Sequence, residues 1–400
     1  MSLIQTLIRT GPAEKLQLLQ KRSSYYKEVS NLSSQAQASP ALLGVGILGA
    51  GPVTQAIHLP SLARLGNILE VRHIMDVDPA VAEAVAGRVG ANFSTSMEEL
   101  LADPAVDIVA ICSPHQFHAA QVIASCRAGK KAVLCEKPFA MSGEEAAGIS
   151  AVSAETGVPI IVGAMHTFDP GWLAAEDAWG DLPEQVHTVR SSIVLPPNPR
   201  FEDFATEIVG RVPLPGSDTS DPKVIKAMLT GGVMGLAIHD LPLVRRFTPD
   251  FESVEVLHAE IVRPFGYVIS LRAGSVTIEL RAAMNATWEP SWEFEAIGND
   301  AALRIDFTPS YVHAGSATAR ILSEGRTTVL GPFGHNGYEG EWRKLAELAS
   351  GTGQPPSAET LIHDLEFALA IADAAAGRID ANPVDAGSAA SSPADQEVNA

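Results

Sequence analysis

A glycine turn near residue 50 is the first place in the chain where the residue types point to ligand chemistry. Residues 43–48 are apolar and typical of a buried strand, Gly49-Ala50-Gly51 follows, and residues 53–65 have the pattern of a helix. Such a turn lets backbone N–H groups at the start of a helix approach a pyrophosphate, whose charge the helix dipole favours. Thr54 stands where the dinucleotide-binding pattern has its third glycine, which serves packing rather than phosphate contact. An ordinary tight turn is the alternative interpretation.

Asp76 ends the second apolar run of the chain, residues 69–75. A carboxylate at the tip of the second strand can accept both ribose hydroxyls of an adenosine, and it repels a 2′-phosphate. No Arg or Lys follows Asp76 where a 2′-phosphate would lie. The sequence therefore predicts NAD rather than NADP as the cofactor. The alternative is that residues 76–79 are a polar turn that only caps the next helix.

The motif Glu136-Lys137-Pro138 closes another buried strand, residues 132–135. It falls at the end of the sheet where a nicotinamide must lie. A lysine ammonium there can donate to a substrate hydroxyl and stabilise a developing alkoxide during hydride transfer. A cis Lys137–Pro138 bond would fix the turn. The alternative is an ordinary surface lysine at a strand end.

The composition limits the class of protein and its partners. The chain has 400 residues, 46% of them hydrophobic and 19% charged, which predicts a well-buried globular enzyme of two domains. The formal net charge of −19 without a basic stripe argues against nucleic acid and anionic membranes as partners. Cys112, Cys126 and Cys135 are odd in number and lack metal-ligand spacing, so we expect reduced cysteines, no metal and a cytoplasmic protein.

Strand and helix patterns alternate from residue 41 onward, which predicts a doubly wound parallel sheet at residues 41–164. Residues 1–40 precede it as an arm and linker without the features of a secretory signal. We expect strands at 43–48, 70–75, 91–93, 107–112, 132–135 and 159–162, and helices at 53–65, 79–89, 96–102, 115–128 and 142–156. Ser142 and Glu145 predict a capping box at the start of the last helix.

The second half, residues 165–376, has a different pattern and predicts an α+β domain. Residues 196–230 form a long polar stretch, read as an active-site loop or a partly helical insertion. Five β-rich runs then indicate a mostly antiparallel sheet with helices on one face, at 254–261, 267–272, 276–282, 292–297 and 303–307. Helices are expected at 341–350 and 358–375, and residues 377–400 should be a disordered tail.

These motifs together resemble the glucose–fructose oxidoreductase/inositol dehydrogenase/rhizopine-catabolism (Gfo/Idh/MocA) family of NAD(P)-dependent oxidoreductases, over about residues 41–375. The matching elements are Gly49-Ala50-Gly51, His58-Leu59-Pro60, Asp76, Ser113-Pro114-His115 with His118, and the run from Ala128 to Pro138. The resemblance implies a Rossmann domain and an open-faced antiparallel sheet, with the substrate held between that sheet and the nicotinamide. It implies cofactor contacts at Gly49, Gly51, Pro52, Val53, Asp76, Ser113, Pro114, His115, His118, Glu136 and Lys137. A helix-start role is the alternative for His115 and His118.

His239 matches the catalytic histidine of this family, which implies that it is the general base and acts with Lys137. It follows Gly231-Gly232, but Gly235 stands one turn earlier where the family usually has Asp. The imidazole therefore lacks a carboxylate that would orient it and stabilise its protonated form. We expect empty space at Gly235. Asp240 cannot easily replace that acid, because adjacent helical residues point about 100° apart.

Several polar residues are candidates for substrate contacts. His166 lies where family members often have Arg, so it is expected to touch the substrate or to replace the missing acid–base partner; a structural histidine is the alternative. Asp240, Asn198 and Arg200 are further candidates.

Three functions remain open on the sequence. The first is NAD-dependent oxidation of a secondary hydroxyl of a sugar, a sugar derivative or a cyclitol. The second is hydrolysis of a glycoside through transient oxidation and elimination with NAD recycled, and the third is a non-catalytic NAD-binding regulator. We also expect a homodimer or homotetramer joined through the 251–330 sheet, because an uncovered β-rich face would expose an apolar patch.

Overall fold

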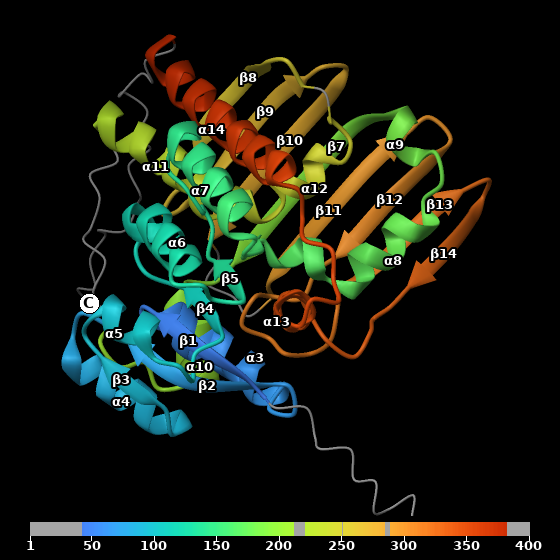
Figure 1. The fold of residues 1–400 in the computed structure, drawn as a ribbon. Coiled ribbons are helices and arrows are strands. Elements are labelled where there is room, and N and C mark those ends of the chain that lie inside the picture. The colour runs from blue at the N-terminus through green and yellow to red at the C-terminus, as the bar shows by residue number, and fades with distance from the viewer. Residues whose placement is uncertain (1–41, 212–220, 250, 285–288, 382–400) are drawn as a thin grey trace, which may run out of the picture. The chain divides into compact units, whose positions relative to one another are not determined.

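The computed structural model describes residues 42–211, 221–249, 251–284 and 289–381 (Figure 1). The chain divides into two units, 1–42 and 43–400, and the following account concerns the second. The predicted arm at 1–40, residues 212–220 of the polar stretch and residues 382–400 of the predicted tail lie outside the described residues.

A six-stranded parallel sheet forms the first domain, in the order β3-β2-β1-β4-β5-β6. The order changes direction between β1 and β4, and this is the point where ligands bind in doubly wound sheets. The predicted strands are all present, with ends that differ by at most one residue. They are β1 (Leu43–Leu48), β2 (Leu69–Met75), β3 (Asn92–Ser94), β4 (Ile108–Ile111), β5 (Ala132–Cys135) and β6 (Ile160–Val162).

The predicted helices of this domain are also present. The first is divided into a π-helical turn, η1 (Thr54–His58), and a regular helix, α3 (Leu59–Arg64). Ser142 caps its helix as predicted, but the Glu145 side chain accepts from the backbone of Met141 instead of Ser142. The others are α4 (Pro79–Val89), α5 (Met97–Ala102), η2 (His115–Phe117), α6 (His118–Arg127) and α7 (Gly143–Thr156).

An eight-stranded sheet forms the second domain, in the order β14-β13-β12-β11-β7-β10-β9-β8. It is antiparallel except for the parallel pair β7–β10. Five strands were predicted: β8 (Val254–Ile261), β9 (Gly266–Ala273), β10 (Val276–Met284), β11 (Ser291–Gly298) and β12 (Ala301–Asp306). Three were missed: β7 (Val186–Leu195), β13 (Thr318–Ser323) and β14 (Arg326–Leu330). The missed β7 lies in the middle of the sheet.

Helices cover one face of this sheet (Figure 1). The polar stretch 196–230 is partly helical, with α10 (Asn198–Ala205) and the start of α11 (Pro222–Gly235). The last helix runs past Gly377, where we expected the tail to begin. The remaining helices are η3 (Met165–Phe168), α8 (Pro170–Ala178), α9 (Leu182–Gln185), η4 (Ala237–His239), α12 (Leu241–Arg245), α13 (Gly337–Ala349) and α14 (Ala358–Ala381).

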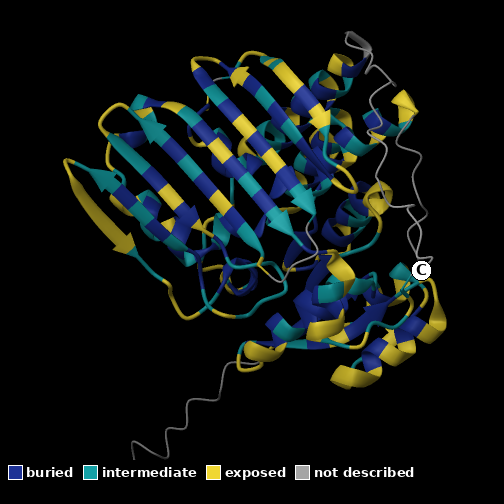
Figure 2. Cartoon of the chain, turned by 180° about the vertical axis from the view of Figure 1, so that it is seen from behind, coloured by how far each residue is buried: buried dark blue, intermediate teal, exposed yellow. Residues whose placement is uncertain are grey.

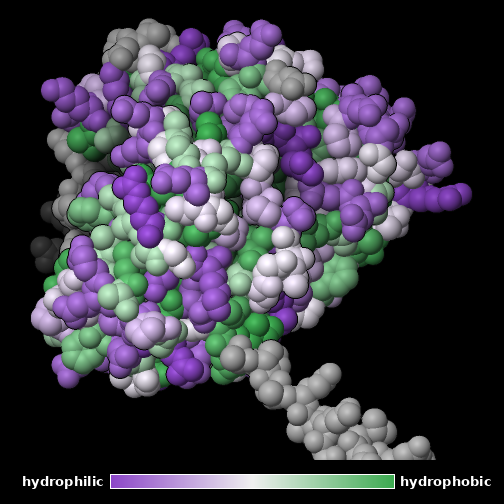
Figure 3. Space-filling view, viewed as in Figure 1, coloured by the Kyte–Doolittle hydropathy of each residue, from purple (hydrophilic) through white to green (hydrophobic). Residues whose placement is uncertain are grey.

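The uncovered face of the sheet is polar, so the expectation of an apolar patch there is wrong. Buried and exposed residues alternate along its strands (Figure 2), because successive side chains point to opposite faces. Charged residues occupy the outward positions: Arg190 pairs with Glu279 at 2.7 Å, and Arg304 pairs with Glu295 at 2.8 Å. On the helix-covered side, hydrophilic and hydrophobic residues intermix over the surface shown in Figure 3.

One cluster of buried apolar side chains extends through both domains. It contains Val109 and Val133 of the parallel sheet, Ile278 of the antiparallel sheet, and Phe367 and Ile371 of α14. A second link between the domains is the segment 206–211 after α10. The backbone N–H and C=O of Val209 both bond to the side-chain amide of Gln55, which also donates to Ala50 O in the glycine turn.

Candidate functional site

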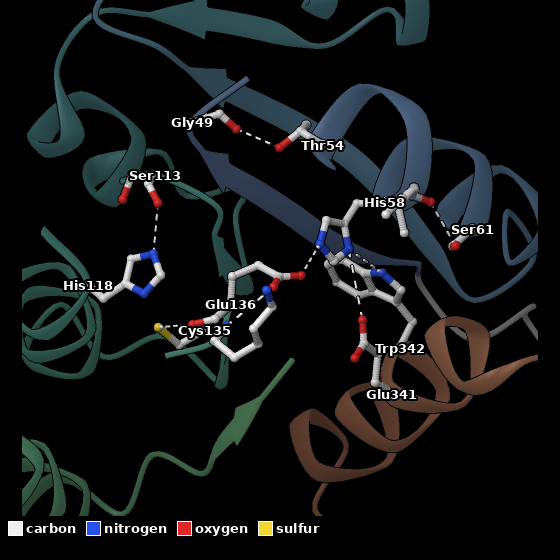
Figure 4. Close-up of polar contacts among 12 residues, drawn as sticks. Gly49, Thr54, His58, Ser61, Ser113, His118, Cys135, Glu136, Glu341 and Trp342 are labelled. Atoms are coloured by element: carbon white, nitrogen blue, oxygen red, sulfur yellow. Dashed lines mark hydrogen bonds and ion pairs between the residues drawn. The ribbon is translucent and has the colours of Figure 1, made fainter. Parts of the chain in front are cut away.

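The glycine turn after β1 has the geometry of a phosphate-binding turn. Gly49 has φ +94°, and a Cβ there would come within 2.8 Å of the backbone of Cys112 and Ser113, so only glycine fits. A Cβ at Gly51 would meet nothing within 4 Å, which leaves open space at the start of the helix. Thr54 replaces the third glycine by donating from Oγ1 to Gly49 O at 2.6 Å (Figure 4). The turn, with Pro52 and Val53 following it, therefore fits a pyrophosphate.

Asp76 connects the end of β2 to this turn. Its Oδ2 accepts from the backbone N–H of Ala50 at 2.8 Å, and its Oδ1 accepts from Asp78 N–H at 3.0 Å. The cap of α4 is Asp78, whose side chain accepts from Ala80 and Val81, so Asp76 does not serve as that helix cap. Asp76 is half-buried. The carboxylate thus shapes the turn and remains accessible to a ribose.

His118 holds two loops together at the carboxyl end of the sheet. Its ring is fully buried, with Nδ1 2.8 Å from Pro138 O and Nε2 2.8 Å from Ser113 O (Figure 4). Both nitrogens are therefore used within the protein, which favours the structural alternative over a cofactor contact. Pro114 and His115 are exposed beside it, and burial and neighbouring cations lower the pKa of His115.

Lys137 reaches from the parallel sheet to the second domain. Its Nζ donates to Gly235 O, the last residue of α11, at 2.7 Å, and the Lys137–Pro138 bond is cis as expected. Burial lowers the pKa of Lys137, while the Glu136 carboxylate opposes that change. A Cβ at Gly235 would meet nothing within 4 Å, so the expected empty space is there.

His239 is the last residue of η4, a short helix that begins directly after Leu236, the C-cap residue of α11. Position 235 is therefore not one regular helical turn before it. The ring is 7% exposed, and its Nδ1 has no hydrogen-bond partner among the described residues. Burial, followed by the charges of Lys137 and His166, lowers the pKa of His239 well below its usual value. The imidazole is thus held neutral with a free nitrogen, as a general base requires.

Asp240 is paired with His166 rather than with His239. The carboxylate is fully buried; Oδ1 lies 2.6 Å from His166 Nδ1, and Oδ2 accepts from Ser191 Oγ at 2.6 Å and from Trp292 Nε1 at 2.8 Å. The His166 ring stacks on Phe307 at a centroid distance of 3.7 Å. His166 is in turn 6.4 Å from His239, centroid to centroid. Two of the four predicted substrate contacts, His166 and Asp240, therefore lie together beside His239.

The strands that were missed supply part of this arrangement. Ser191 lies on β7, and its serine-rich sequence showed no clear strand pattern, so no signal connected it to Asp240. Asn198 and Arg200 lie on α10, exposed and half-buried respectively, and they remain predictions as substrate contacts.

A cavity of about 460 Å³ borders Lys137 and is lined by Pro138, Thr167 and Ile238 among others. Of the proposed reacting groups only Lys137 lines this cavity; His166 and His239 do not, although their chain neighbours Thr167 and Ile238 do. Two arginines at its wall are already paired: Arg245 with Asp364 at 2.7 Å and Arg246 with Glu176 at 2.6 Å.

Residues 43–164 match the sequence model of the GFO_IDH_MocA family, described as an oxidoreductase family with an NAD-binding Rossmann fold. The Rossmann domain is therefore similar in sequence to that family. The chain is 29% identical over 201 residues to inositol 2-dehydrogenase of Rhizobium meliloti (strain 1021), a match that covers 50% of this chain and 53% of the relative. It thus spans about half the length of that curated relative.

Two solved structures show that the fold extends beyond the Rossmann domain. The UDP-N-acetylglucosamine 3-dehydrogenase GnnA from Acidithiobacillus ferrooxidans superimposes with a TM-score of 0.64 at 19% identity, covering 84% of this chain and 98% of that one. KijD10, a 3-ketoreductase from Actinomadura kijaniata in complex with NADP and TDP-benzene, superimposes with a TM-score of 0.62 at 18% sequence identity. The match covers 83% of this chain and 98% of that one. The predicted fold, a Rossmann domain with an open-faced antiparallel sheet, is confirmed.

Gly49→Ala and Gly51→Ala should separate the structural from the ligand-binding use of the turn. Gly49→Ala forces a strained φ and a clash with backbone, so we expect a loss of about 1–3 kcal/mol in the free energy of unfolding. Gly51→Ala adds a methyl group to open space and should leave the unfolding free energy nearly unchanged while weakening dinucleotide binding. Chemical unfolding and calorimetric titration with NAD check both. Equal destabilisation by the two variants would contradict the assignment.

Proposed function

We propose that this chain is an NAD-dependent oxidoreductase that transfers hydride between a secondary hydroxyl of a sugar, sugar derivative or cyclitol and nicotinamide. The observation that carries the proposal is the meeting of Lys137 and His239. Lys137 Nζ bonds to Gly235 O, and Lys137 lowers the pKa of His239 through its charge. A cation and a neutral imidazole at the carboxyl end of an NAD-binding sheet are the two groups that carbonyl–alcohol interconversion needs.

In the oxidation direction, the free nitrogen of His239 accepts the proton of the substrate hydroxyl. Lys137 donates a hydrogen bond to the same oxygen and stabilises the charge that develops on it. In the reduction direction His239 returns the proton. The His166–Asp240 pair, buried beside Phe307 and Trp292, fixes the wall next to His239. When bound, the nicotinamide supplies the hydride acceptor or donor.

The other two functions have less support. The relative and the two structures reported above are named as dehydrogenases or a ketoreductase, and no feature of the site favours elimination from a glycoside. A non-catalytic regulator would not need a partnerless buried nitrogen at His239, which costs free energy to maintain.

Lys137→Met should raise the pKa of His239. Burial is the first cause of the low pKa and the Lys137 charge is the second, so removing the charge moves the pKa upward while burial still holds it below normal. NMR titration of labelled histidine in the cofactor-free protein measures this. Lys131→Met, which removes an exposed lysine that pairs with Asp107 at 2.8 Å, is the matched control and should leave the pKa of His239 unchanged.

His239→Ala and Lys137→Ala should each lower turnover by on the order of 10²-fold or more, because acid–base or alkoxide stabilisation is lost. Dinucleotide affinity should change much less. Steady-state kinetics on a sugar and cyclitol panel, beside calorimetric titration with NAD, gives both quantities. Normal turnover in His239→Ala would transfer the role of base to His166, and normal turnover in both variants would leave only the dinucleotide fold supported.

NAD rather than NADP is proposed as the cofactor because of Asp76. Its carboxylate is accessible at the tip of β2 and would repel a 2′-phosphate. The relatives do not decide the choice, since KijD10 was crystallised with NADP.

Asp76→Asn should narrow the preference for NAD over NADP by on the order of tenfold, because it removes the repelling charge. The amide oxygen can still accept from Ala50 N–H, so the turn is preserved, unlike in Asp76→Ala. Calorimetric titration with both dinucleotides checks this. A wild-type protein that prefers NADP would refute the assignment.

We also propose a homo-oligomer, a dimer or tetramer, joined through the uncovered face of the sheet, in the cytoplasm. The three cysteines are free, which suits a reducing compartment. No helix in the described residues is long and apolar enough to cross a membrane.

The assembly should weaken with salt, because the outward face presents charged side chains such as Arg190 and Arg304 rather than an apolar patch, and salt screens attraction between such faces. Light scattering at low and high ionic strength measures the mass at micromolar concentration. A monomer at low salt would refute the proposal.

A further inference from the structure

The mechanism above does not use a buried group of four residues, drawn in Figure 4, one of which directly precedes Lys137 in the chain: Glu136, His58, Glu341 and Trp342. Glu136 follows β5, His58 ends η1, and the other two lie on α13. His58, Glu341 and Trp342 are 0% exposed, and Glu136 is 9% exposed. Burial of two carboxyls and an imidazole together is costly unless their protons are well placed. The position of each proton therefore determines which groups of the cluster are ionised.

His58 stands between two carboxyl groups that compete for its protons. Its Nε2 lies 2.9 Å from Glu136 Oε1, and its Nδ1 lies 4.0 Å from Glu341 Oε1. The indole N–H of Trp342 donates to Nδ1 at 3.2 Å. Burial lowers the pKa of His58, but Cys112 and Glu136 raise it by more, so the ring holds its Nε2 proton firmly toward Glu136. The indole N–H makes Nδ1 an acceptor and opposes a second ring proton there.

Glu341, unlike Glu136, receives no hydrogen bond from His58. Neither of its oxygens has a hydrogen-bond partner among the described residues, and burial raises the pKa of this carboxyl well above its usual value. It is thus a neutral acid. Glu136 receives His58 Nε2–H at one oxygen and Lys137 N–H at the other, at 3.3 Å, and although burial opposes it, these contacts lower its pKa. Glu136 is thus the ionised member.

We propose that His58 is a positioning residue of the reaction, held in one tautomer by Trp342 so that it keeps Glu136 ionised beside Lys137. The Glu136 carboxylate then supports the ammonium form of Lys137 against the effect of burial. Without the indole N–H, the ring could place its proton on Nδ1 toward Glu341, and Glu136 would lose its donor. The inference rests on the proposed function only in assigning the Lys137 charge to catalysis. The effect of His58 on the protonation of Glu136 and Lys137 does not depend on that function.

Other titratable groups near Glu136, His58 and Lys137 are Cys112, Cys135, Tyr311, Tyr338, His115 and His239. Burial raises the pKa of Cys135 and of both tyrosines and lowers that of both histidines, so these groups stay neutral where Lys137 titrates. Cys112 is tested separately by the conservative change Cys112→Ser.

Competitive acetylation of Lys137 with acetic anhydride, followed by mass spectrometry of its peptide, reports the fraction of free amine without any substrate. His58→Leu removes the donor to Glu136, so Lys137 should lose protons more readily and its acetylation below its pKa should rise about tenfold. His58→Gln keeps an amide N–H near the position of Nε2 and should restore the wild-type rate. Trp342→Phe should change acetylation in the same direction as His58→Leu, and Glu341→Gln, which mimics the neutral acid, should have no effect.

Unchanged acetylation in both His58→Leu and Trp342→Phe would overturn the proposal, as would a rise in Glu341→Gln equal to that in His58→Leu. Circular dichroism checks that each variant is folded. If His58→Leu does not fold, the acetylation of Trp342→Phe decides whether the proposal stands. The same rise in Cys112→Ser would assign the effect to the thiol and also overturn the proposal. If acetylation follows the expectation while no sugar or cyclitol is turned over, the proposed function fails and the positioning role stands.

Discussion

The hydrogen bond from Lys137 Nζ to Gly235 O is the interaction on which the site depends. It joins the end of a parallel strand to the end of a helix in the other domain, and His239 follows that helix directly. Because an ammonium in a partly buried place needs an acceptor, the carbonyl of Gly235 fixes where the lysine points. The same residue carries no side chain, which leaves open space where the family resemblance predicted a carboxylate. Gly235 thus both orients the Lys137 side chain and leaves open space beside it.

A second consequence follows for the acids of the site. The buried carboxyl group of Asp240 bonds to His166, Ser191 and Trp292, and none of these contacts reaches His239. His239 therefore keeps its free nitrogen, and Lys137 keeps its proton with the help of Glu136. Among His166, Asp240, Lys137 and His239, the group whose buried nitrogen has no hydrogen-bond partner in the described part of the chain is the proposed base, His239.

Much of the parallel sheet was predictable because its strands are short apolar runs separated by turn and helix signals. The glycine turn, Asp76 and Lys137 were found for the same reason: each follows a recognisable strand. The antiparallel half was harder. In β7 polar residues such as Ser191 and Ser192 break the alternation, so its central place in the sheet was not visible. The pairing of Asp240 with His166, and of His58 with Glu136, joins residues 74 and 78 positions apart, and no local pattern reports such contacts.

The apolar cluster that runs through both domains affects how a substrate can enter. Domains joined by small polar contacts open and close as rigid bodies, but a shared hydrophobic core resists such hinge motion. The groups around Lys137 are then already in place before any ligand arrives, and little conformational entropy is lost on binding. If the substrate occupies the cavity beside Lys137, the shape of its walls sets selectivity, and exchanging wall residues such as Thr167 or Ile238 would change the range of substrates without rebuilding the catalytic groups.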